Sequence, residues 1–157
     1  MAKELQPGDS APDFDLPADG GGRARLMDYA GRTLVLYFYP KDDTEGCTKQ
    51  AIGFTEKLNA FRKAGADVLG VSKDSPAKHD KFKAKHGLGV TLASDEDGAV
   101  CEAYGVWKEK TLYGRKYMGV ERSTFLIGTD GRILRIWRAM RVPGHIDQVL
   151  DAVREDA

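Results

Sequence analysis

The sequence predicts an α/β protein with three layers, in which helices cover both faces of a central mixed sheet. Strand and helix patterns alternate between residues 33 and 104, and a strand hairpin followed by a helix closes the chain. The length of 157 residues suits one domain that buries about 70% of the surface of its unfolded chain. We therefore expect a single domain over residues 1–157.

The first half of the chain predicts a strand, a helix and a second strand. Thr33–Tyr39 (TLVLYFY) is an apolar run typical of a strand buried on both faces, and Pro40 ends it. Apolar residues then recur every three or four positions from Thr44 to about Ala64, as on one face of a helix. Val68–Val71 predicts a strand that a right-handed crossover makes parallel to the first. Residues 1–30, rich in Gly, Pro and Asp, predict only short strands and turns.

The second half predicts shorter elements. Ser75 and Pro76 form the cap and first-turn pair that opens a helix, which runs to His86 and is closed by Gly87. Pro143 precedes a last helix with an apolar stripe. The other expected elements are a strand at 90–93, a brief helix at 95–104, strands at 113–120, 122–127 and 133–137, and a turn at 129–131 between hairpin arms with alternating apolar side chains.

The composition argues against two classes of partner. Lys and Arg together number 24, as do Asp and Glu, so no net positive charge is available to hold a nucleic acid. No apolar run approaches the roughly 20 residues that span a bilayer, and the polar N-terminus lacks the apolar segment of a signal peptide. We expect a cytoplasmic protein that binds neither nucleic acid nor membranes.

No residue pattern indicates a metal or a cofactor, and we expect neither. Two cysteines are too few for a four-ligand zinc site. The three histidines lack zinc-protease spacing, and the acidic cluster after the first long strand lacks the length and order of a calcium loop. We expect solvated surface positions for these side chains, which are His79, His86, His145, Asp42, Asp43 and Glu45.

Cys47 is the strongest candidate for chemistry. It lies in the segment that leaves the Thr33–Tyr39 strand, at the edge of an open sheet where ligands usually bind. If Thr44 caps the following helix, Cys47 is its third residue, where backbone N–H groups lack intrahelical partners and the helix dipole presents positive charge. Both features stabilise a thiolate. The alternative is that Cys47 is a small buried apolar residue.

The segment YFYPKDDTEGCT (37–48) resembles the active-site pattern of the peroxiredoxins, in which proline, three residues, threonine and two residues precede a cysteine. The stretches TLYGRKYMGVERSTFLIGTDGRI (111–133) and VSKDSPAKHDKF (71–82) resemble the Q-type, or bacterioferritin comigratory protein, subfamily, and the likeness runs nearly end to end. The resemblance implies a thioredoxin-like fold. It also implies a thioredoxin-dependent thiol peroxidase that reduces hydrogen peroxide and organic hydroperoxides.

The resemblance implies a role for four residues. Cys47 is the peroxidatic nucleophile, Pro40 shields it, Thr44 donates its hydroxyl to the peroxide, and Arg122 holds the thiolate and the substrate. Plainer alternatives are a helix cap for Thr44, a strand end for Pro40 and a solvated charge for Arg122.

Ionisation of a thiol explains only part of such an activity. A free cysteine with a pKa near 8.5 is about 3% ionised at pH 7, so full ionisation raises its reactive fraction only about thirtyfold. We expect most of the acceleration from donors aimed at the two peroxide oxygens, namely the Cys47 N–H, the Thr44 hydroxyl and the Arg122 guanidinium.

The expected product of peroxide attack is a sulfenic acid at Cys47, which a second thiol must reduce. Ile52 stands where many Q-type relatives have that resolving cysteine, and residues 80–85, the alternative position, contain none. Cys101 remains, but its neighbours Val100, Ala103 and Tyr104 predict a small residue packed on an apolar helix face. We expect a one-cysteine mechanism with thioredoxin, glutaredoxin or glutathione as reductant, in a monomer or weak homodimer.

Two questions stay open at this point. A peroxide-sensing redox switch, which binds a partner after oxidation of Cys47 and does not turn over, also fits the missing resolving cysteine. Glu45 stands where the family usually has proline. Its carboxylate suits the first turn of a helix but opposes a nearby thiolate, and the sequence does not decide which effect prevails.

Overall fold

β3 (Thr33–Phe38) is the middle strand of the main sheet, and all six of its residues are buried. The computed structural model describes residues 4–139 and 141–156. The five strands of this sheet follow the order β5-β4-β3-β8-β9. β3, β4 (Ala66–Ser72) and β5 (Thr91–Ser94) are parallel, whereas β8 (Ser123–Ile127) runs antiparallel to β3 and β9 (Ile133–Trp137) antiparallel to β8. The mixed sheet is therefore confirmed.

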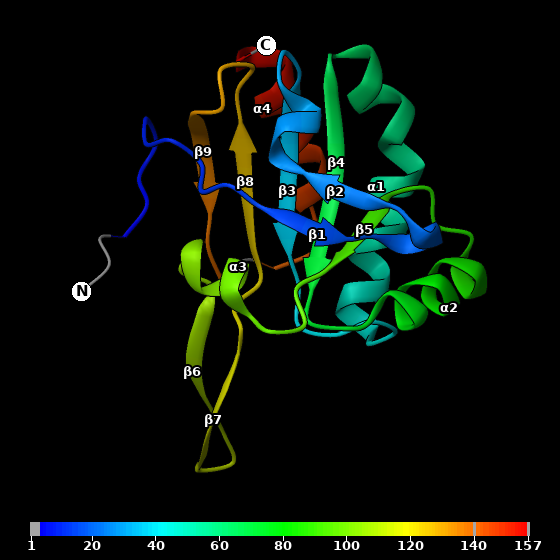
Figure 1. The fold of residues 1–157 in the computed structure, drawn as a ribbon, viewed down its shortest axis with the longest axis vertical. Coiled ribbons are helices and arrows are strands. Elements are labelled where there is room, and N and C mark those ends of the chain that lie inside the picture. Colours follow the sequence, from blue (N-terminus) through cyan, green and yellow to red (C-terminus); the bar gives the residue numbers. More distant parts are fainter. Residues whose placement is uncertain (1–3, 140, 157) are drawn as a thin grey trace.

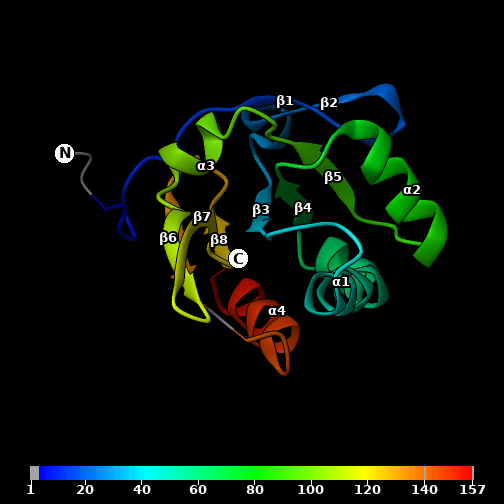
Figure 2. The same cartoon turned by 90° about the horizontal axis from the view of Figure 1, so that it is seen from below.

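The two faces of this sheet are covered by different elements, which gives the expected three layers. α1 (Glu45–Lys63) and α4 (His145–Asp156) lie side by side on one face, as Figure 2 shows. The other face is covered by α3 (Ala99–Ala103) and by the hairpin of β1 (Asp15–Pro17) and β2 (Arg23–Arg25), with the short 3-10 turns η1 (Asp19–Gly21) and η2 (Leu26–Tyr29). α2 (Pro76–His86) lies at the β5 edge.

Alternate residues of β3 point to opposite faces of the sheet. Val35 and Tyr37 belong to the core cluster beneath α1 and α4. Leu34, Leu36 and Phe38 belong to a second cluster on the other face. The sheet thus separates two hydrophobic cores, one on each of its faces.

The capping pattern of α2 is confirmed. The Ser75 hydroxyl accepts a hydrogen bond from the Lys78 N–H, and Gly87 ends the helix with a φ of 63°. Only two α2 residues, His79 and Phe82, are buried. α2 is therefore held by much less apolar contact than α4, in which six residues are buried.

The region between α3 and β8 differs from the prediction. The expected strand at 113–120 is one arm of a hairpin of β6 (Trp107–Leu112) and β7 (Arg115–Val120), with its turn at Tyr113 and Gly114. This hairpin is a separate two-stranded sheet that projects from the end of the main sheet where α1 begins (Figure 1). The sequence of β6, WKEKTL, carries no apolar face from which to predict it.

Two other expectations need correction. The helix expected at 95–104 is only five residues long, because Asp95–Gly98 forms a turn before it. β8 is the first arm of the hairpin for which we expected apolar and polar side chains to alternate. It is buried along its whole length because both of its faces are covered, so the expected alternation is wrong for β8. In the described part of the chain, no helix is long and apolar enough to cross a membrane.

Candidate active site

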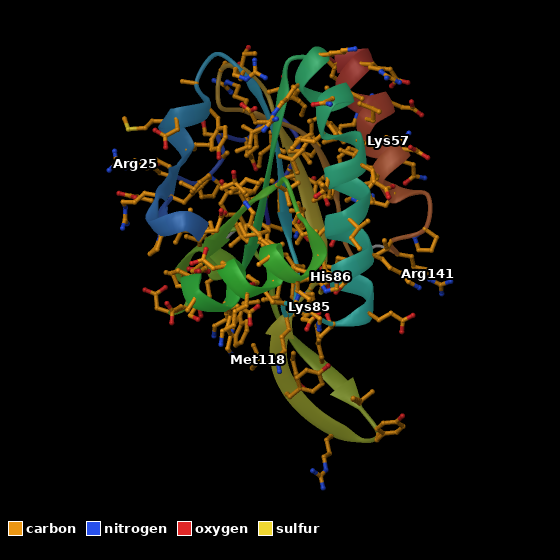
Figure 3. All side chains as sticks on the ribbon, turned by 90° about the vertical axis from the view of Figure 1, so that its right-hand side faces the viewer. Arg25, Lys57, Lys85, His86, Met118 and Arg141 are labelled. Carbon is orange, nitrogen blue, oxygen red and sulfur yellow. The ribbon has the colours of Figure 1, made fainter. Side chains whose placement is uncertain are left out.

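The start of α1 brings Cys47 to the end of the central strand. Thr44 is the N-cap residue, so Cys47 is the third residue of the helix, as predicted. Its side chain is only 2% exposed. The helix begins at the end of the sheet from which the β6–β7 hairpin projects (Figures 1 and 3). Cys47 therefore combines burial with the unpaired amide groups of a helix N-terminus.

Arg122 meets Cys47 from the segment between β7 and β8. Its Nη2 donates to the Cys47 Sγ at 3.2 Å, and its Nη1 donates to the Gln50 Oε1. A Cβ atom on Gly46 would lie 3.1 Å from the same Nη2, so the glycine leaves room for the guanidinium to approach α1. The structure thus brings together two residues 75 positions apart that the sequence analysis singled out.

Gln50 is a residue that the sequence analysis missed. It is fully buried one helical turn after Cys47, and its carbonyl oxygen holds the Arg122 fork in place. Its Nε2 has no hydrogen-bond partner among the described residues. A polar residue on the otherwise apolar stripe of α1 was the signal that could have indicated it.

Thr44 is oriented toward the loop that precedes the helix. Its hydroxyl donates to the Lys41 carbonyl at 2.9 Å. Thr44 occupies the N-cap position, as predicted, but its side chain accepts no hydrogen bond from the helix. The alternative that Thr44 caps the helix through its side chain is therefore wrong. Donation to a peroxide would require Thr44 to exchange this bond. Pro40 is exposed at the beginning of the same loop.

The predicted surface positions of Asp42, His79 and His145 are wrong. His79 and His145 are at most 1% exposed and Asp42 is 9% exposed. Each finds a hydrogen-bond partner in the interior, so its burial is not penalised as that of a lone polar group would be. Asp43 and Glu45 are exposed as expected, and His86 is partly exposed.

His145 lies near enough to Arg122 to interact with its charge, and it carries no charge at neutral pH. Burial and, to a smaller degree, the Arg122 charge lower the pKa of His145 from 6.5 to about 4. Its Nε2 lies 2.9 Å from the Thr124 hydroxyl.

Lys110, on β6, has its pKa lowered by burial and by the Arg122 charge, and its ammonium group donates to the Val120 carbonyl.

Cys101 occupies the other face of the sheet. It is fully buried and belongs to the second core cluster with Val100 and Tyr104, so the prediction of a packed small residue is confirmed. Burial raises the pKa of the Cys101 thiol, and the Asp95 carboxylate raises it further. Neither cysteine forms a disulfide. Because Cys47 belongs to the first cluster, the sheet stands between the two sulfur atoms.

A family model, a named relative and a solved structure each match most of this chain. Residues 7–136 match the model of the AhpC/TSA family. A protein of Coxiella burnetii named "Putative peroxiredoxin bcp" is 49% identical, over 93% of this chain and 97% of its own. A solved PrxQ mutant of Xylella fastidiosa has a TM-score of 0.93 at 42% identity and 99% coverage of both chains.

A further solved relative is described by an activity. The bacterioferritin comigratory protein of Xanthomonas campestris, whose structure was studied for its alkyl peroxide reduction, has a TM-score of 0.87 at 46% identity and 91% coverage of both chains. The thioredoxin-like architecture expected from the resemblance is therefore confirmed.

Proposed function

The chain belongs to the AhpC/TSA family and is a peroxiredoxin, a thiol peroxidase, and from this premise we propose that Cys47 is its peroxidatic nucleophile. The Cys47 thiolate attacks one oxygen of a hydroperoxide, an S–O bond forms and the O–O bond breaks. The products are Cys47 sulfenic acid and an alcohol, or water from hydrogen peroxide, after the leaving oxygen takes up a proton. The single observation that carries this proposal is the Arg122 guanidinium 3.2 Å from the Cys47 sulfur.

We propose roles for the other residues from the contacts in the structure and from the family resemblance. Arg122 stabilises the thiolate and the charge that develops on the peroxide oxygens, with Gln50 fixing its orientation. The Cys47 N–H and the Thr44 hydroxyl are the further donors, and Pro40 shields the sulfur. Donors held in place before the reaction supply the acceleration that ionisation alone does not.

For the second half-reaction we propose an external thiol. It attacks the sulfenic sulfur, a mixed disulfide forms and water leaves, and a second thiol then releases Cys47. Thioredoxin, glutaredoxin and glutathione are the candidate donors, in keeping with a cytoplasmic location. The position of Cys101 behind the sheet supports a mechanism that does not use it.

The proposed substrates are hydrogen peroxide and organic hydroperoxides. The alkyl peroxide reduction named for the Xanthomonas campestris relative supports the second class. We also propose that the whole chain forms one domain that acts as a monomer or weak homodimer. Support for the single domain is that α4, which begins after the matched residues 7–136, packs in the same core cluster as α1.

A coupled assay tests the proposed function. Peroxide consumption is measured with NADPH, a disulfide reductase and each candidate reductant in turn, for the wild type and for Cys47→Ser. Sustained turnover by the wild type alone supports the proposal. Consumption of one equivalent of peroxide per chain with every reductant would instead indicate the sensor, which the relatives do not favour.

A further inference from the structure

The loop Pro40–Thr44, which joins β3 to the helix of Cys47, is separated from α2 by a cavity. The cavity has a volume of about 350 Å³. Residues 41–43 line one side, and Lys78, Lys81, Phe82 and Lys85 of α2 line the other. The attachment of the loop to α2 therefore depends on the side chains that bridge the two.

Asp42 makes the buried bridge. Its Oδ2 lies 2.6 Å from the Nδ1 of His79, and its Oδ1 accepts a hydrogen bond from the Tyr39 hydroxyl. Its backbone N–H donates to the Asp74 carboxylate at 2.8 Å. His79 is fully buried, and its Nε2 lies 2.9 Å from the Ala93 carbonyl. The chain of contacts thus runs from the loop through α2 to the edge strand β5.

The partners of His79 determine where its protons lie. The Ala93 carbonyl can only accept, so Nε2 carries a hydrogen. A lone pair on Nδ1 would be repelled by the Asp42 carboxylate, so the short contact between them requires a further proton on one of the two groups. Besides the hydrogen on Nε2, one proton therefore lies between the His79 Nδ1 and the Asp42 Oδ2. A buried bond of this kind is weakened strongly when either partner is removed, because the other is left unpaired.

A second set of contacts between the loop and α2 is exposed. Asp43 lies 2.6 Å from the ammonium group of Lys85 and 2.8 Å from the Nε2 of His86, near the start of α1 (Figure 3). Exposed ion pairs contribute little, because water and salt screen them. They offer a matched control on the same helix and the same loop.

The two half-reactions make opposite demands on this loop. Peroxide attack needs the start of α1 held in one position, so that the Cys47 N–H and, after it exchanges its bond to Lys41, the Thr44 hydroxyl can donate to the substrate. Reduction by an external thiol needs access to a sulfur that is only 2% exposed here. A contact that holds the loop closed therefore favours the first step and hinders the second.

We propose that His79 is a positioning residue, which acts through Asp42 to hold the Pro40–Thr44 loop in the closed, peroxide-reactive position. It touches neither Cys47 nor the peroxide. The proposal rests on the proposed function, because it assumes that Cys47 is oxidised and that an external thiol reduces it.

The test measures the two half-reactions separately. Sulfenic acid formation with hydrogen peroxide is followed by stopped flow, and reduction of the preformed sulfenic acid is followed with thionitrobenzoate as the thiol. His79→Phe, which keeps the ring and removes both bonds, is expected to slow the first step at least tenfold and to speed the second severalfold. Asp42→Asn is expected to shift both rates in the same directions. His79→Gln, whose amide can still donate to Asp42, is expected to recover part of the first rate.

The control is His86→Ala, which is expected to change each rate by less than twofold. Amide hydrogen exchange of His79→Gln and Asp42→Asn is expected to quicken in residues 41–44 and in α2 but not in α4. This readout and these two variants decide the question if His79→Phe does not fold. A general loss of structure would quicken amide exchange in α4 as well and would overturn the proposal, as would two unchanged rates.

The outcomes also separate this proposal from the proposed function. If the wild type forms no sulfenic acid at Cys47, the proposed function fails and His79 has no step to influence. If the wild type turns over and the His79 variants match it in both half-reactions, only the positioning role is refuted.

Discussion

Cys47 and Cys101 differ much less in their own positions than in their neighbours. Each is the third residue of a helix, and they are 2% and 0% exposed. Arg122 donates to the Cys47 sulfur, whereas Asp95 accepts hydrogen bonds from the Val100 and Cys101 N–H groups. A carboxylate thus occupies the α3 amides that could have stabilised a thiolate. The comparison teaches that helix position and burial do not distinguish the two cysteines, whereas the charge beside each one does.

The largest expected effect is a difference in alkylation between the two cysteines of the folded protein. Burial and Asp95 disfavour the Cys101 thiolate, and each unit by which a pKa rises removes about tenfold of the reactive form. We expect iodoacetamide at pH 8 to modify Cys47 at least about a hundredfold faster than Cys101. Peptide mass spectrometry over time measures both rates, and unfolding the protein should make them similar. Comparable alkylation rates of Cys47 and Cys101 in the folded protein would contradict this expectation.

The next effect isolates Arg122. We expect Arg122→Ala to slow peroxide attack far more than the roughly thirtyfold that loss of ionisation can explain, even at a pH where the variant thiol is fully ionised. Stopped-flow rates with hydrogen peroxide across a pH series provide the measurement. Arg122→Lys keeps the charge without the fork that binds Gln50, and should recover only part of the rate. Equal rates for wild type and Arg122→Ala at high pH would limit Arg122 to stabilising the thiolate.

The third effect concerns stability on the Cys47 side of the sheet. The pKa of His145 is lowered from 6.5 to about 4 in the folded state, so its contribution to stability is complete above pH 6.5 and is lost as the pH falls toward 4. The loss amounts to at most about 3 kcal/mol of the free energy of unfolding. Denaturant titrations of the wild type and His145→Gln at pH 7, 5.5 and 4.5 measure it. The same pH dependence in both proteins would show that His145 is not responsible.

Local patterns carried the successful part of the fold prediction. The apolar run of β3, the stripe of α1 and the caps of α2 depend on neighbouring residues, so the sequence alone indicates them. β6 depends on its pairing with β7, and WKEKTL has no apolar periodicity of its own. The hairpin was therefore predicted only in its second arm.

The site was predictable in part for a related reason. Cys47 follows from its place at a helix start, whereas Arg122 and the donor role of Thr44 were inferred only through the family resemblance. The burial of Asp42 depends on His79, 37 residues away, and the role of Gln50 depends on Arg122, 72 residues away. A pattern of spacing does not reveal partners that only the fold brings together.

The smallest expected effect concerns Glu45. Its side chain is 85% exposed and forms an ion pair with Lys49 at 3.0 Å, so water and the neighbouring ammonium group screen its charge from the sulfur. We expect Glu45→Gln to change the alkylation rate of Cys47 by less than about threefold. A rate series at low and high salt measures this change. If Cys47 of Glu45→Gln is alkylated ten times faster than Cys47 of the wild type at low salt, the Glu45 carboxylate destabilises the thiolate and this expectation is wrong.

Single-turnover peroxide consumption by Cys47→Ser and Cys101→Ser, with the products identified by mass spectrometry, tests most directly the claim that the guanidinium-bound cysteine is the reactive one. Cys101→Ser is expected to consume one equivalent of peroxide at the wild-type rate and to carry a sulfenic acid at Cys47, while Cys47→Ser consumes none. Peroxide consumption by Cys47→Ser, or a Cys47–Cys101 disulfide in the oxidised wild type, would contradict it.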